Sequence, residues 1–211
     1  MGLHSRKEYT KGTLDESDIQ GDPWRHVELW VQQAVEAGIH DPTAFVLSTL
    51  DKQGFPHGRV VLLRETRNGE LVFFTNYNSE KGRDVTRTPH AGATFFWPQL
   101  ERQIRVRGRV HRIEAHESDV YFASRPRASQ LGAWSSEQSE TVSSRIELEN
   151  RFEQYLVEFE GREVTRPPHW GGFALKPEFI EFWQGRASRM HDRIRCELSE
   201  DGGWVLTRLQ P

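Results

Sequence analysis

The chain has 211 residues, enough to bury a core within one domain. A formal net charge of -3 gives no overall basic field, which excludes bulk attraction to nucleic acid or to an anionic membrane, so any anion site must be local. Cys196 is the only cysteine, which excludes an internal disulfide framework, and there is neither an apolar run of ~20 residues nor a hydrophobic signal core. We therefore expect a cytoplasmic protein with no membrane partner.

The first predicted element is a helix, with Asp22 as N-cap, Pro23 at its first position and Gly38 past its end. Short β-rich runs follow, separated by turns too short to hold crossover helices. A mainly antiparallel sheet with flanking helices, closed into a barrel, is therefore expected. The runs cover residues 44–50, 59–65, 71–76, 93–97 and 103–114.

Helical spacing then predicts a helix at about 117–124, possibly extending further, and a second at about 141–160. Strand-like sequence returns at 171–183 and 193–211, where the Gly202-Gly203 pair predicts a turn. The first ~20 residues are polar and rich in turn formers. We expect residues 1–20 to be a mobile arm, unless a ligand or partner orders them, and residues 21–211 to be a single domain.

The usual dinucleotide, P-loop, zincin, zinc-ribbon and hydrolase motifs are absent, and the nine histidines are scattered, so we expect no metal site. If the chain is extended from Ser188 onward, Arg189, His191 and Arg193 share one face. Such a row suits an anionic aromatic ligand, because guanidinium groups bind anions and histidine can move protons at neutral pH. A solvated strand face is the competing interpretation.

Other phosphate-binding residue types lie at predicted strand ends and in loops. They are Arg59, Arg64, Thr75, Ser79, Lys81, Tyr121, Arg125 and Ser129. The turn around Ser79 could begin a short helix whose N–H groups face an anion, although a helix cap with a solvated lysine explains the same residues. The arginines near Ser129 could equally compensate the dipole at a helix C-terminus.

The ordered motifs resemble one family, the pyridoxine/pyridoxamine 5'-phosphate oxidases. The resemblance rests on SRPRASQLGAW at 124–134 and FWQGRASRMHDR at 182–193, and extends to RKEYTKG at 6–12, FFTNYNSEKG at 73–82 and the closing RLQP. It covers nearly the whole chain. It implies an FMN-binding split β-barrel working as a homodimer with the flavin at the interface. The implied reaction oxidises pyridoxamine and pyridoxine 5'-phosphate to pyridoxal 5'-phosphate with O2, releasing H2O2 and, from the amine, NH3.

The resemblance also implies roles for individual residues. Arg189 and His191 would act over the substrate ring as the catalytic pair, and Arg6 and Tyr9 would close as a lid. The substrate phosphate would be held by Arg64, Tyr121, Arg125 and Ser129. The implied FMN contacts are Arg59, Val60, Val61, Leu62, Leu63, Arg64, Phe74, Thr75, Ser79, Glu80, Lys81, Gln103, Gln138, Ser139, Trp183 and Arg193.

Three of these positions depart from the family pattern. Arg64 stands where lysine is common, which keeps the charge but changes its reach, and Phe74 replaces a frequent tyrosine. Glu80 stands where a basic residue usually lies beside the FMN phosphate. A carboxylate there would repel phosphate, so either Glu80 faces solvent or flavin binding is weaker.

Two further hypotheses stay open on sequence alone. The first is a split-barrel flavoprotein that acts on another substrate. The second is a nucleic-acid-binding barrel that uses the arginines of 102–112, although their alternation with Ile104, Val106 and Val110 fits a solvated strand face equally well.

Overall fold

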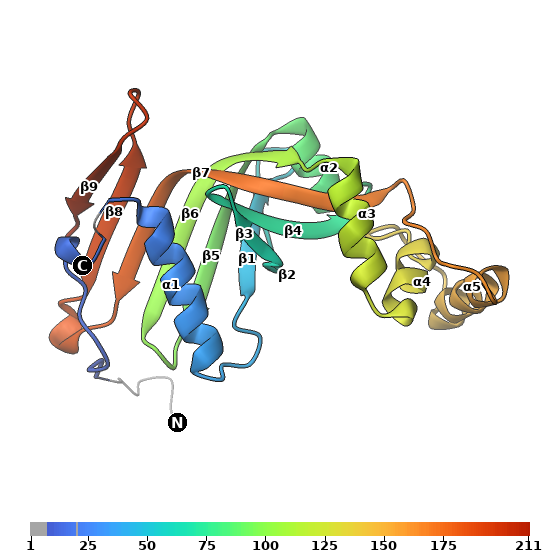
Figure 1. Ribbon diagram of the computed structural model, residues 1–211, viewed down its shortest axis with the longest axis horizontal. Helices are drawn as coiled ribbons and strands as arrows, with labels where there is room; N and C mark the ends of the chain where they lie inside the picture. Colours follow the sequence, from blue (N-terminus) through green and yellow to red (C-terminus); the bar gives the residue numbers. More distant parts are fainter. Residues whose placement is uncertain (1–7, 20) are drawn as a thin grey trace.

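The computed structural model describes residues 8–19 and 21–211, and antiparallel strands dominate it (Figure 1). Nine strands form one sheet in which every pairing is antiparallel. The main path runs β2-β1-β5-β6-β7-β4-β3, and β8 and β9 extend it from β7. The strands are β1 Ala44–Leu50, β2 Pro56–Leu62, β3 Glu65–Arg67, β4 Glu70–Asn76, β5 His90–Trp97, β6 Arg102–Arg112, β7 Trp170–Gln184, β8 Asp192–Leu198 and β9 Trp204–Arg208.

The sheet curls back on itself because its path begins and ends on neighbouring segments of the chain. β2 and β3 lie at opposite ends of the path, yet only Leu63 and Arg64 separate them in sequence. Leu63 N–H donates to the Thr43 carbonyl beside β1, whereas Arg64 N–H donates to the Val72 carbonyl in β4. The prediction of one strand over 59–65 is therefore wrong at its end, since the chain changes partner strands there and splits the barrel.

Alternation along β6 separates the core from the outer surface of the sheet. Ile104, Val106 and Val110 are buried, and the arginines between them point outward. Arg105 pairs with Glu181 at 3.2 Å, and the Arg107 guanidinium lies 3.9 Å from the centre of the Phe179 ring. The arginines of β6 thus form the outward face of the strand, and Arg105 and Arg107 contact side chains of the neighbouring strand β7.

The first helix, α1 (Pro23–Glu36), forms as predicted. The Asp22 carboxylate accepts the Trp24 N–H, Pro23 opens the first turn and Gly38 follows the end at a φ of 64°. The buried face of α1 packs on the sheet, where the Trp30 ring meets Phe182 edge-on. The helix therefore covers the end of β7 that is farther from α3 (Figure 1).

The remaining helices lie at the other end of β7 (Figure 1). These are α2 Glu80–Arg87, α3 Ala115–Ser124, α4 Arg127–Ser135 and α5 Arg145–Glu158, with the 3-10 turns η1 Glu16–Ile19 and η2 Ala187–Arg189 elsewhere. Pro126 separates α3 from α4. The predicted apolar stripe of the last helix is largely outside the core, because no residue of α5 is buried and Ile146 is exposed. Within the part of the chain described, no helix is long and apolar enough to cross a membrane.

The long strand β7 connects these two ends. It contains 15 residues, and its first residue lies beside α3 while its last lies beside α1 and β8 (Figure 1). At ~3.3 Å per residue, the strand measures about 40 Å along its course from Gly171 to Trp183. A bulge between Arg107 and Gly108 of β6 lets the pair bend midway.

Gly108 provides a test of this bend. A Cβ at this position would lie 1.9 Å from the Lys176 carbonyl oxygen, so we expect Gly108→Ala to lower the free energy of unfolding by about 1–3 kcal/mol. Gly132→Ala in α4 is the matched control, because nothing lies within 4 Å of its added methyl group. It should leave stability unchanged or raise it by up to ~1 kcal/mol. Urea unfolding of both variants, followed by circular dichroism, measures the difference, and equal stabilities would contradict the bulge.

Candidate functional site

A cleft of about 470 Å³ lies where β2, β4, α2, α3 and α4 meet. Three of its lining residues are cationic, Arg64, Lys81 and Arg125, and no carboxylate is among the described residues that line it. Its composition is therefore that of an anion site. Sequence analysis predicted most of the lining residues, namely Val60, Val61, Leu62, Arg64, Phe74, Thr75, Lys81, Tyr121, Arg125, Ser129 and Gln138.

Lys81 and Thr75 converge on one oxygen atom in this cleft. Lys81 Nζ and Thr75 Oγ1 each donate to Oε1 of Gln138, both at 3.0 Å. Burial, with the nearby Arg59 charge, lowers the pKa of Lys81, although Glu80 opposes the shift. Two donors aimed at a single oxygen, in a place that disfavours an uncompensated cation, are suited to a phosphate oxygen.

The first turn of α2 adds backbone donors near Lys81. The hydroxyl of Ser79 caps this helix by accepting the Gly82 N–H at 3.3 Å, and it also accepts from Lys81 Nζ at 3.4 Å. The helix-cap interpretation of Ser79 is therefore confirmed, and its hydroxyl also contacts Lys81. The positive end of the α2 dipole adds to the attraction for an anion.

Arg59 lies behind the lining of the cleft. Its Nη1 donates to Thr49 Oγ1 at 2.7 Å and to the Leu47 carbonyl at 3.3 Å, and its Nη2 lies 3.7 Å from Asp84. Burial lowers the pKa of Arg59 despite this carboxylate. Among the described residues, the buried Nη2 has no hydrogen-bond acceptor. A buried guanidinium N–H without an acceptor marks a place for an additional anion.

The other wall of the cleft is a stack of aromatic rings. The Phe74 and Tyr121 rings lie face to face with centres 3.8 Å apart, and Trp170 continues the stack 5.5 Å from Phe74. The Arg125 guanidinium lies 4.5 Å from the centre of the Trp170 ring, and its buried Nη1 has no acceptor among the described residues. Phe74 thus contributes its ring to the stack without a hydroxyl, and the Arg125 guanidinium packs on Trp170.

Glu80 does not face the cleft. Its carboxylate is about half exposed and lies 3.7 Å from Nε2 of His57, whereas its backbone N–H donates to the Ser139 hydroxyl. Of the two alternatives left open by the sequence, the structure supports the one in which the Glu80 carboxylate faces solvent. Leu63 is also absent from the lining, because its side chain is buried in the barrel core.

A second group of predicted residues lies at the opposite end of β7. Gln103 of β6, Trp183 of β7 and Arg193 of β8 are register partners across three adjacent strands. His191 packs against Trp183 with ring centres 4.7 Å apart, and the Tyr9 ring lies 5.6 Å from His191. These aromatic and cationic residues form a second cluster, and Arg6 lies outside the described residues.

The chain around Arg189 is not the extended strand expected from Ser188 onward. Residues Ala187–Arg189 form the turn η2, and Ser188 and Arg189 have φ values of 55° and 62°. The strand β8 begins only at Asp192, so Arg189 does not share a strand face with His191 and Arg193. The left-handed turn instead leaves Arg189 exposed, next to His191 and the end of β7.

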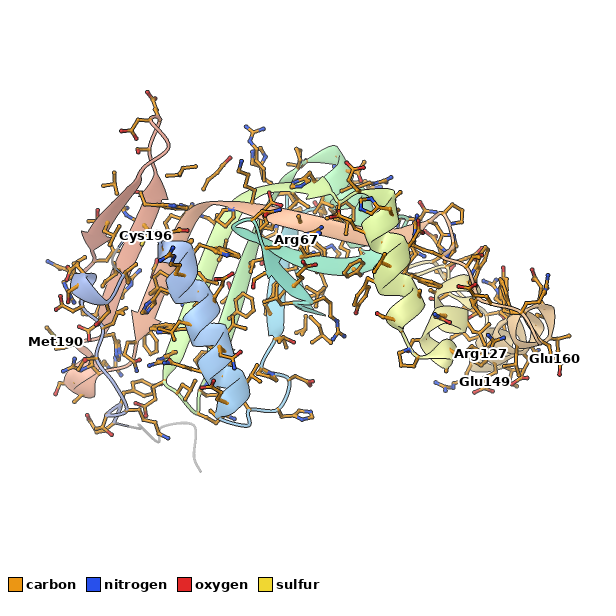
Figure 2. All side chains as sticks on the ribbon, viewed as in Figure 1. Arg67, Arg127, Glu149, Glu160, Met190 and Cys196 are labelled. Atoms are coloured by element: carbon orange, nitrogen blue, oxygen red, sulfur yellow. The ribbon has the colours of Figure 1, made fainter. Side chains whose placement is uncertain are left out.

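The two groups of one chain are far apart. Figure 2 shows Met190, which lies between Arg189 and His191 in the sequence, and Arg127, which follows the Arg125 region, at opposite ends of the molecule. About 40 Å of β7 separates the Gly171 end from Trp183. One small ligand cannot contact both groups of the same chain.

Sequence reasoning missed some residues of the cleft. Trp170, Asn76 and Ser136 also line it, and Asn76 Nδ2 donates to the Ser136 carbonyl at 3.2 Å. The sequence WGGF at 170–173 contains one signal for Trp170, because its two glycines allow close packing. A Cβ on Gly171 would lie 2.0 Å from the Tyr77 hydroxyl. Nothing in the local sequence distinguishes Asn76 or Ser136 from ordinary turn residues.

Two family models match this chain. The model described as pyridoxamine 5'-phosphate oxidase covers residues 31–157, and the one described as the pyridoxine 5'-phosphate oxidase C-terminal dimerisation region covers 170–211. Curated proteins named pyridoxine/pyridoxamine 5'-phosphate oxidase align over nearly their full length. That of Paraburkholderia phytofirmans is 47% identical over 98% of this chain and 97% of its own. That of Mannheimia succiniciproducens is 48% identical over 100% of both chains.

Solved structures support the same relationship. The crystal structure of PhzG from Burkholderia lata, in complex with tetrahydrophenazine-1-carboxylic acid, has a TM-score of 0.88 and 28% identity, over 95% of this chain and 98% of that one. A pyridoxamine 5'-phosphate oxidase-related, FMN-binding protein from Nostoc punctiforme has a TM-score of 0.72 at 16% identity, over 90% and 98% of the two chains, which shows a shared fold. From its full-length relatives and the two matching models, this chain belongs to the pyridoxamine 5'-phosphate oxidase family.

Proposed function

We propose that this protein is an FMN-dependent oxidase that converts pyridoxamine 5'-phosphate and pyridoxine 5'-phosphate to pyridoxal 5'-phosphate. The observation that carries this proposal is the cationic cleft, in which Arg64, Lys81 and Arg125 have no carboxylate beside them among the described lining residues. Both the cofactor and the substrate carry a phosphate, so a slightly acidic protein has to gather cations locally to bind them.

The residues present fit FMN. Lys81 and Thr75 already donate to one amide oxygen, and the buried Nη2 of Arg59 has no hydrogen-bond acceptor among the described residues, so a phosphate could be held here. The substrate phosphate would be held next to it by Arg125, Tyr121, Ser129 and Arg64, where the Arg125 Nη1 also lacks an acceptor. Two buried guanidinium nitrogens without a hydrogen-bond acceptor among the described residues, one in Arg59 and one in Arg125, support the binding of two anionic ligands.

We infer that the complete site combines two copies of the chain. The phosphate-binding half and the ring-binding half lie at opposite ends of β7, so a second copy would have to bring Gln103, Trp183, Arg193, Arg189 and His191 to this cleft. A two-fold symmetric dimer does this twice and gives two equivalent sites. The match of residues 170–211 to a dimerisation region supports the arrangement.

The chain's own groups would bind, orient and desolvate the substrate. When bound, FMN supplies the hydride acceptor, and O2 restores its oxidised form with release of H2O2. Arg189 would hold the substrate ring with its oxidisable carbon toward the cofactor, and His191 would hydrogen-bond the substrate or accept its proton. Nδ1 of His191 accepts the Arg186 backbone N–H at 3.1 Å, so a neutral His191 carries its proton on Nε2, and this favours the hydrogen-bonding role over proton removal. The lid of Arg6 and Tyr9 would exclude water; with an amine substrate, hydrolysis of the resulting imine releases NH3.

The reaction itself is tested by mixing FMN-loaded protein anaerobically with pyridoxamine 5'-phosphate and following flavin absorbance. We expect bleaching that reverses in air, with pyridoxal 5'-phosphate formed. Flavin that stays oxidised with both the amine and the alcohol would contradict the proposed substrates. The second candidate, a flavoprotein that oxidises another aromatic anion, would then be tested with tetrahydrophenazine-1-carboxylic acid, because the PhzG relative is described with this oxidisable ligand.

Substitutions at two neighbouring residues of α2 should differ strongly in their effect on FMN affinity. Lys81→Gln should weaken FMN binding about 10- to 100-fold, because a charged hydrogen bond contributes ~1.5–3 kcal/mol. Glu80→Gln is the matched control; it should change the dissociation constant less than about threefold, since its exposed carboxylate faces His57. Quenching of flavin fluorescence on titration into apoprotein measures both values. A large gain in affinity from Glu80→Gln would mean that this carboxylate turns toward the phosphate.

Mixed dimers test whether each site combines two chains. Arg125→Ala and Arg189→Ala alter different half-sites, so each homodimer should be nearly inactive. A heterodimer isolated with two affinity tags would contain one intact site of two and should recover about half of wild-type activity. A heterodimer of Arg125→Ala with Arg64→Ala, both in the same half-site, is the control and should have no intact site. No recovery in the first heterodimer would contradict the composite site.

A further inference from the structure

Glu101 is an unusual residue for a turn between two strands. It ends the turn between β5 and β6, only 1% of its surface is exposed, and its φ is 56°. Both a buried carboxylate and a left-handed non-glycine backbone are unfavourable unless specific contacts compensate them. We therefore expect specific contacts that stabilise Glu101 in this position, which lies outside the lining of the cationic cleft.

Those contacts join three segments of the chain. Oε2 of Glu101 accepts the backbone N–H groups of Thr10 and Lys11, at 2.8 Å and 3.0 Å. Its carbonyl oxygen accepts the Gly185 N–H at 2.7 Å and Nε2 of Gln184 at 3.2 Å. One residue thus attaches the N-terminal segment to the β5–β6 turn and to the end of β7.

Tyr9 immediately precedes the two N–H groups that the carboxylate holds. Its ring meets Trp183 edge-on at 5.7 Å and interplanar angle 87°, and lies 5.6 Å from His191. Gly185 leaves the space for this ring, because a Cβ there would lie 2.8 Å from Tyr9 Cγ. The position of Tyr9 in the ring-binding half-site therefore depends on how the backbone at Thr10 and Lys11 is fixed.

We propose that Glu101 is a positioning residue that holds Tyr9 against Trp183 and His191, so that the N-terminal segment encloses the substrate ring. This inference rests on the proposed function. Without the carboxylate, the Thr10 and Lys11 N–H groups lose their acceptor and bond to water, and the segment leaves the half-site more often. The substrate ring is then less enclosed, which weakens its binding in both the ground state and the transition state.

A double-mutant cycle tests the proposal in the FMN-loaded protein. Glu101→Ala should lower kcat/KM about tenfold, chiefly by raising KM. Tyr9→Ala should have an effect of similar size, and the double variant should be no worse than Tyr9→Ala alone, because Glu101 acts through Tyr9. Glu101→Gln keeps an oxygen that can accept both N–H groups and should recover much of the loss. Glu147→Gln is the control, since this carboxylate accepts the Ser143 N–H at the start of α5, away from Tyr9.

Proteolysis gives a readout that does not need activity. Trypsin should cut after Lys11 several times faster in Glu101→Ala than in the wild type, because cleavage requires the held segment to open. Additive effects of Glu101→Ala and Tyr9→Ala, or an unchanged cleavage rate, would overturn the proposal for Glu101. An inactive wild-type protein would instead refute the proposed function, and the cleavage rate would still decide whether Glu101 holds the segment.

Discussion

The separation imposed by β7 is the constraint on which the site depends. This one strand pairs with β4 beside the cationic cleft and with β8 beside His191, so it fixes the distance between the two groups of functional residues. Its course cannot shorten without loss of the β6–β7 ladder, in which the bulge at Gly108 sets the bend. Each chain therefore has the cationic cleft and the group around His191 at separate ends of β7, and the dimer we propose follows from the distance between them.

Electrostatics explains why the cleft is preorganised for anions. Burial lowers the pKa of Lys81, Arg59 and Arg125, which means that their charged forms lack full solvation. A bound phosphate would replace that solvation with charge-assisted hydrogen bonds. The same burial makes these cations costly without a ligand, so FMN should stabilise the folded protein by mass action. Without a ligand, the neutral Oε1 atom of Gln138 accepts hydrogen bonds from Lys81 and Thr75 and holds both side chains in position.

Much of this could be predicted from the sequence, and the misses have physical causes. Local signals located α1 through Asp22 and Pro23, and short β-rich runs located β1 and β4 to within one residue, whereas β3 was not predicted. Motif resemblance supplied Lys81, Tyr121 and Arg125, which the structure brings together in one cleft. The extended interpretation at Arg189 failed because non-glycine residues rarely adopt a left-handed turn. Glu101 was missed because its contacts join residues distant in sequence, which no local pattern encodes.

The most direct test of the two-chain site is sedimentation of the FMN-loaded protein over a dilution series, monitored by flavin absorbance and by protein absorbance. Because the proposed site holds each FMN with groups from two chains, the flavin should sediment only with a species of two chains. Free FMN should appear in step with dissociation of that species. A single chain that sediments with tightly bound FMN would contradict the account.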